Sequence, residues 1–190
     1  ATNRLSLEPF LWAEAVTHFA RAMGSARSGD VARSRKDIEK LESLQDALVK
    51  AKDSYWVKQV DIQRRVASAW YLRAENKNDE ALELMKSAAD LEDSTDKHPV
   101  TPAPIQPARE LLGEMLLELG NPSQALKEFE VSHRVEPNRF RGLYGAAKAA
   151  QKSGDREKAH LYYAKLISLC ERADADRPEL KEAKTFLADK

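Results

Sequence analysis

GNPSQALKEFEVSHRVEP, which begins at Gly120, and GDREKAHLYYAKLISLCE, which begins at Gly154, are two copies of one pattern. Three kinds of residue recur at a spacing of 34: a glycine (Gly120 and Gly154), an alanine (Ala125 and Ala159) and a large aromatic (Phe129 and Tyr163). A spacing that holds for three residue types at once indicates an internal repeat, and repeats must be found before any other feature is interpreted.

The pattern has the residues that a helical hairpin needs. Two helices cross closely only where a small side chain such as Ala125 lets them approach. Phe129 follows one helical turn later on the same face, where it can fill the space beside the crossing. The glycine ends the first helix, Asn121 or Asp155 caps the second, and Pro122 suits a first helical position. Each copy therefore predicts a helix, a tight turn and a second helix.

The signature of small, small, aromatic and proline residues is present as Gly113, Ala125, Phe129 and Pro137. With a period of 34, it resembles the tetratricopeptide repeat family. The resemblance implies an all-α fold, a right-handed α-α superhelix in which helical hairpins stack side by side as a solenoid. It also implies a concave groove that holds peptide segments or whole partner proteins.

Two weaker units precede these copies. The matching residues of the unit from about 61 to 93 are Ala69, Leu72, Ala81 and Met85, and Asn76 replaces the glycine. The matching residues of the unit from about 15 to 50 are Ala22, Gly29, Ser34 and Ile38. We therefore predict a single solenoid domain over residues 1–190, with four hairpins at about 10–50, 54–93, 107–137 and 139–172. A polar-backed helix at 177–188 is expected to cap the exposed end of the stack.

A proline-rich insertion at 94–106 interrupts the period, because Ala81 aligns with Ala125 at an offset of 44. Its prolines impose an extended path and remove backbone donors (Pro99, Pro102, Pro104 and Pro107). The insertion is either a spacer or a loop that lines the groove and presents a proline motif. Nearby potential metal ligands have no fixed ligand spacing, so we expect no metal site there (Glu92, Asp93, Asp96 and His98).

The composition restricts the function. The 31 Lys and Arg residues equal the 31 Asp and Glu residues, so no overall field attracts nucleic acid or an anionic membrane. No segment reaches the ~18 apolar residues that a membrane span needs, and no signal pattern is present. The sequence therefore does not identify the compartment, and a cytoplasmic location is the default expectation. The sequence has no initiator methionine, and helical patterning is under way by about Pro9, so we expect a fragment, the C-terminal repeat region of a larger protein. The style of the sequence suggests a bacterial source. Cys170 is the only cysteine and is expected to pack in the core.

Motifs of catalysis are missing. The nearest match to a phosphate loop, from Gly24 to Gly29, is followed by Asp30, which would repel phosphate. The four histidines are far apart in sequence, and no zinc helix motif, nucleophile elbow or dinucleotide fingerprint occurs. We therefore expect no enzyme activity, no cofactor and no metal.

The resemblance implies that the first helix of each hairpin lines the groove. Alignment of these helices gives the candidate partner-binding residues in rows: Phe19, Val66, Glu110 and Tyr144; then Met23, Trp70, Glu114 and Lys148; with Arg73 and Arg141 beside them. The groove is expected to be apolar in its N-terminal half and charged in its C-terminal half.

Each half leaves alternatives open. Glu114 could pair with Lys148, and Glu118 with Lys152, as salt bridges between hairpins, or the same charges could grip a polar peptide. A large apolar patch is seldom left in water, so something should cover the other half. The candidates are upstream repeats, the N-terminal segment with Phe10 and Trp12, a second copy of the chain in a homodimer, or an apolar peptide.

The best-known specific site of the family is a clamp of lysines, asparagine and arginine that holds a chaperone's acidic carboxyl terminus. This sequence departs from it, because the matching places hold Phe19, Met23, Glu110 and Glu114. Two glutamates would repel a carboxylate, so we expect no free peptide carboxylate in the groove.

The sequence therefore predicts a non-enzymatic scaffold that binds a protein or peptide partner in a concave groove, chiefly through Val66, Trp70 and Tyr144. The alternative is a regulatory sensor that binds a small apolar ligand in the N-terminal half of the groove. Burial of Trp70 inside its hairpin would show that the groove assignment is wrong.

Overall fold

The computed structural model describes residues 10–96, 104–173 and 177–189, and within them every regular element is an α-helix. The chain packs as two compact units, residues 1–103 and 104–190. The first unit contains α1 (Leu11–Arg27), α2 (Val31–Lys50), α3 (Ser54–Ala74) and α4 (Asn78–Asp93). The second contains α5 (Ala108–Glu118), α6 (Pro122–Val135), α7 (Phe140–Ser153), α8 (Arg156–Leu169) and α9 (Pro178–Ala188).

The turns of the hairpins have the backbone that their sequences predict. Gly29, Gly120 and Gly154 follow first helices with φ of 85°, 77° and 84°, in the left-handed region that glycine enters without strain. Asn76, which occupies the glycine place in the second hairpin, also has a positive φ of 64°. Asparagine tolerates this conformation better than most residues, so the departure from the repeat pattern preserves the turn.

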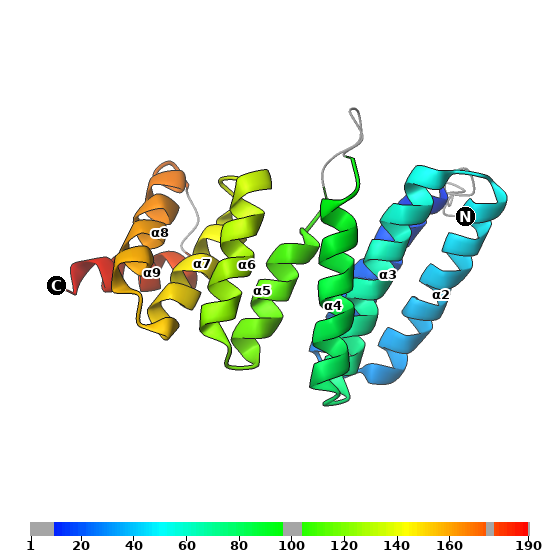
Figure 1. Cartoon of the computed structure of the whole chain (residues 1–190), viewed down its shortest axis with the longest axis horizontal. Helices are drawn as coiled ribbons and strands as arrows, with labels where there is room; N and C mark the ends of the chain where they lie inside the picture. Colours follow the sequence, from blue (N-terminus) through cyan, green and yellow to red (C-terminus); the bar gives the residue numbers. More distant parts are fainter. Residues whose placement is uncertain (1–9, 97–103, 174–176, 190) are drawn as a thin grey trace, which may run out of the picture. The chain divides into compact units, whose positions relative to one another are not determined.

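Unit 1 consists of two antiparallel hairpins, α1 with α2 and α3 with α4, in which α3 also packs against both α1 and α2 (Figure 1). Ser34 takes the place that alanine has in the other repeats. Its side chain is fully buried, and its hydroxyl donates a hydrogen bond to the carbonyl oxygen of Ala22 at 3.0 Å. The hydroxyl is thereby satisfied at the helix crossing, which explains why serine is tolerated there.

Unit 2 has the hairpins α5 with α6 and α7 with α8, with α6 packing against α7 and α8 against α9. The ring of Phe129 on α6 lies in the crossing between α5 and α7. A Cβ atom built on Gly113 would lie 2.8 Å from this ring, and one built on Gly145 would lie 2.3 Å from it. Both distances are too short for a real contact, so the two glycines provide the space that the aromatic residue fills.

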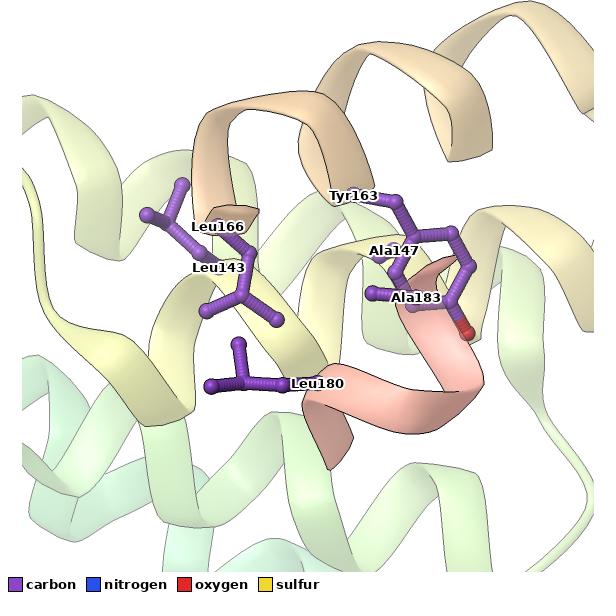
Figure 2. Packing of buried hydrophobic residues seen from close by; sticks show 6 residues of the cluster. All are labelled: Leu143, Ala147, Tyr163, Leu166, Leu180 and Ala183. Atoms are coloured by element: carbon purple, nitrogen blue, oxygen red, sulfur yellow. The ribbon is translucent and has the colours of Figure 1, made fainter. Parts of the chain in front are cut away.

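The C-terminal helix α9 closes the core of unit 2. Figure 2 shows side chains of α7, α8 and α9 converging in one cluster (Leu143, Ala147, Tyr163, Leu166, Leu180 and Ala183). Cys170 is partly buried and packs against this cluster. The helix expected at 177–188 is thus present, and it covers the apolar end of the last hairpin.

The fold class expected from the sequence, an all-α helical repeat, is confirmed: the described residues form two helical hairpins in each unit and a terminal helix. A single continuous domain over residues 1–190 stays a prediction. Most of the expected proline-rich insertion, residues 97–103 with His98, lies outside the described residues. In the described part of the chain, no helix is both long and apolar enough to span a membrane, and no three metal-ligating side chains form a group.

Candidate functional site

The expectation of an exposed apolar patch on the first helices of unit 1 is wrong. Phe19, Met23, Val66 and Trp70 are all buried, and Trp70 is only 3% exposed. Within unit 1, α1 packs against both α2 and α3, and α3 also packs against α4, so the unit has closely packed helix interfaces that can bury these side chains. These residues were expected to line an open groove, but they belong to the buried interior of the chain.

The ring of Trp70 also contacts a charged side chain of α1. The guanidinium of Arg27, in the last turn of α1, lies 4.4 Å from the centroid of the Trp70 ring, a cation-π contact. Arg73, the remaining candidate of this unit, is half-buried, and its Nε has no hydrogen-bond partner among the described residues. Unit 1 therefore uses its predicted site residues for its own packing.

The N-terminal aromatic residues lie at the start of the helices. Trp12 stacks on Trp56 with a centroid distance of 4.6 Å and an interplanar angle of 10°, and Phe10 meets Trp12 edge-on at 6.5 Å. This stack joins the first turns of α1 and α3. It stabilises the hairpin pair.

Glu110 of unit 2 is a structural residue, which corrects its place in the expected groove. Its side chain is 0% exposed, and its Oε1 accepts a hydrogen bond from Nε of Arg139 at 2.9 Å. Burial raises the pKa of Glu110, although the positive charge of Arg139 opposes that effect. Arg139 also donates to the carbonyl oxygen of Ile105 at 3.0 Å, so the pair ties the segment before α5 to the start of α7.

A Cβ atom at Gly142 would lie 2.7 Å from Oε1 of Glu110, so glycine is needed here to admit the buried carboxylate. The partner of Glu110 was not predicted, because Arg139 lies 29 residues away in the turn that precedes α7.

Glu114, one turn after Glu110, lies closer to the surface. Its Oε1 accepts hydrogen bonds from Nε of Arg141 and from the amide nitrogen of Gln106, both at 3.0 Å. The side chain of Arg141 is 59% exposed and that of Glu114 only 14%. The guanidinium of Arg141 is thus the outermost charge of this pair and remains open to solvent.

Tyr144 and Lys148 on α7 meet the C-terminal helix. The Tyr144 hydroxyl donates to Oε2 of Glu182 at 2.7 Å, and the Lys148 ammonium donates to Oε1 of the same carboxylate. Burial raises the pKa of Tyr144, and the hydrogen bond to Glu182 adds to this effect. Glu182 was not among the predicted residues, although it follows Lys148 by one repeat length of 34.

Glu114, Lys148 and Glu182 therefore form one row at equal spacing on α5, α7 and α9. Their charges alternate in sign along the row. Glu114 was expected to pair with Lys148, but in the structure Glu114 pairs with Arg141 and Lys148 pairs with Glu182. Of the predicted site residues in unit 2, Glu114, Arg141, Tyr144 and Lys148 have exposed or half-buried side chains.

A cavity of about 450 Å³, which the sequence analysis did not predict, lies elsewhere in unit 2. It is lined by residues of α6, the turn after it, α7 and α8 (His133, Pro137, Asn138, Leu143, Tyr162, Lys165, Ser168 and Leu169). A site was expected on first helices, whereas most of these residues belong to second helices or to the turn between hairpins.

The arrangement of helix pairs, with small residues at the crossings and an aromatic wedge beside them, defines a tetratricopeptide-type helical repeat fold. Among solved structures, the chain is similar to PcrH from Pseudomonas aeruginosa, with a TM-score of 0.51 and 18% sequence identity, over 67% of this chain and 89% of that chain. At this identity the likeness concerns the fold alone. No family model and no curated protein match the sequence.

Proposed function

We propose that this chain is a non-enzymatic helical-repeat scaffold that binds a polypeptide segment on the first-helix face of unit 2, the surface formed by Glu114, Arg141, Tyr144, Lys148 and Glu182. The observation that carries the proposal is the series of alternating charges at intervals of 34 residues, Glu114 and Lys148 on the first helices α5 and α7 and Glu182 on the terminal helix α9. A regular row of this kind matches an extended segment, whose side chains also recur at regular intervals.

The ion pairs on this face are weak enough for the acidic side chain of a partner to compete with them. Arg141 and Lys148 are paired within the unit, but their side chains are 59% and 30% exposed. An exposed ion pair contributes only about 0.2 to 1 kcal/mol, so a partner carboxylate can replace or join the internal one at small cost. The planar fork of Arg141 is suited to bidentate binding of a carboxylate side chain, and Tyr144 provides an aromatic surface beside it.

Two of the alternative functions depend on residues that are buried in the structure. A homodimer and a small apolar ligand were both expected to use Phe19, Met23, Val66 and Trp70. Because these side chains are buried in the packing of unit 1, no specific observation favours either alternative.

The experiment is a selection of peptides from a displayed random library against the full chain, followed by calorimetry on the selected peptide. We expect Arg141→Glu and Lys148→Glu to weaken binding by about fivefold or more each, because reversal turns an attractive contact into a repulsive one. The matched control is Lys127→Glu, an exposed lysine on α6 that lies outside the face. Equal affinities of all three variants and the wild type would contradict the proposal.

A further inference from the structure

The cavity of unit 2 has the size of a ligand pocket. Its volume of about 450 Å³ falls within the ~300 to 1,000 Å³ that is usual for such sites. It contains none of the residues of the first-helix face. Any binding here is therefore independent of the function proposed above.

One part of the lining is apolar. Leu143, Leu169, Pro137 and the ring of Tyr162 contribute to the wall. Leu169 is 45% exposed, so part of this apolar wall is in contact with water. An aliphatic side chain from a partner would remove this surface from water, at about 25 cal/mol per Å².

The other part of the lining supplies donors. Lys165, Ser168 and Asn138 line the same cavity, and none of the three makes a hydrogen bond or ion pair with another side chain in the part of the chain that the structure describes. The lining contains no Asp or Glu. Lys165 instead lies with its Nζ 5.7 Å from the centroid of the Tyr162 ring.

An acid near the pocket, Glu130, has partners of its own. It accepts a hydrogen bond from the Tyr162 hydroxyl at 3.1 Å and pairs with Lys158 at 2.7 Å. Burial lowers the pKa of His133, and the positive charge of Lys165 lowers it further, against the opposing effect of Glu130. Lys165 and His133 both line the pocket, and its lining contains no carboxylate.

We propose that this pocket is a second binding site, which takes a short polypeptide stretch with an aliphatic side chain next to an acidic one. The aliphatic side chain packs against Leu143 and Leu169, and the carboxylate pairs with the Lys165 ammonium and accepts hydrogen bonds from Ser168 and Asn138. Complementary charge argues for this occupant, because the lining offers a cation and uncharged donors but no anion.

The proposal is tested by NMR titration of the full chain with three blocked dipeptides. Acetyl-Leu-Glu-amide should shift the signals of His133, Lys165 and Leu169. Acetyl-Leu-Gln-amide, which lacks the charge, and acetyl-Ala-Glu-amide, which lacks the aliphatic side chain, should each bind at least about twofold more weakly. Equal binding of all three peptides, or shifts confined to other residues, would overturn the proposal.

A fourth titration distinguishes the source of the carboxylate. If 4-methylpentanoate binds as tightly as acetyl-Leu-Glu-amide, the site is one for small organic acids, and the polypeptide proposal is overturned. Weaker binding of 4-methylpentanoate supports it, because the backbone of the peptide then contributes.

Two pairs of variants locate the binding. Leu169→Asp should abolish the shifts produced by acetyl-Leu-Glu-amide, whereas Leu161→Asp should leave them intact, because Leu161 is 47% exposed on the same helix but does not line the cavity. Lys165→Met should weaken binding about two- to fivefold, and Lys184→Met, on α9, should not. All four positions lie at the surface, so the variants are expected to fold. Equal effects within either pair would overturn the proposal.

Discussion

Lys148 of α7 and Glu182 of α9 form an ion pair across one repeat length of 34 residues. The carboxylate also accepts hydrogen bonds from the hydroxyls of Tyr144 at 2.7 Å and Tyr163 at 3.3 Å. The C-terminal helix thus stands where the first helix of a further hairpin would stand, and Glu182 connects it to the last complete repeat.

The first prediction concerns Glu182→Gln. Burial opposes ionisation of Glu182, but the hydrogen bonds from Lys148 and Tyr144 outweigh burial, so its pKa is lowered in the folded protein. Loss of the charge should therefore reduce the free energy of unfolding by about 1 to 2 kcal/mol at pH 7. Chemical denaturation measures this difference, and Glu157→Gln, at an exposed position on α8, is the control.

The sign of the pH dependence follows from the lowered pKa. The stabilisation by Glu182 is fully present above the ordinary glutamate value of 4.5 and is lost as the pH falls through the folded value. The difference between wild type and Glu182→Gln should therefore shrink in acid. A difference that stays constant down to pH 3 would contradict this account of α9.

The second prediction compares two glycines inside helices. Gly145→Ala should destabilise unit 2 by about 1 to 3 kcal/mol, because the new Cβ would lie 2.3 Å from the buried ring of Phe129. Gly24→Ala, in α1, meets nothing within 4 Å and should stabilise the protein by about 0.5 to 1 kcal/mol through helix propensity. Thermal unfolding measures both changes, and a loss of equal size at both positions would show that the Phe129 contact is not the cause.

The third prediction concerns the buried pair of Glu110 and Arg139. Arg139→Met leaves a carboxylate buried without its cation, which should cost about 3 kcal/mol at pH 7. The cost should fall below pH 4.5, because the pKa of Glu110 is raised and the protonated acid no longer needs a cation. Denaturation at both pH values measures this change.

A double variant provides the control for that experiment. Glu110→Gln in the Arg139→Met background removes the buried charge and should recover part of the stability at pH 7. A double variant that is no more stable than Arg139→Met would mean that Arg139 acts through its contact with the Ile105 carbonyl and not through Glu110.

The sequence predicted the hairpins well because the signals that define them are local. Gly120 and Gly154 end first helices with positive φ, and Asp155 caps α8 by accepting a hydrogen bond from the backbone nitrogen of Lys158 at 3.0 Å. Ala125 and Phe129 are both buried at the crossing, as their spacing indicated. Each of these features depends on residues within one or two turns.

The exposed face could not be predicted in the same way. The repeat offsets align Val66 with Glu110 across the insertion, but they do not show which side of a first helix meets a neighbour. Glu110 is a charged residue in a fully buried place, and only the packing of Arg139 makes that place tolerable. Glu182 was missed because it belongs to the terminal helix, which was expected only to cap the stack.

The most direct test of the proposed binding face is a charge exchange between the protein and a peptide selected for binding to it. Arg141→Glu should weaken the complex, and replacement of the acidic residue of the peptide that faces Arg141 by lysine should restore most of the lost affinity in that variant while weakening binding to the wild type. If no acidic position of the peptide gives this rescue, Arg141 and the first-helix face of unit 2 do not form the binding site.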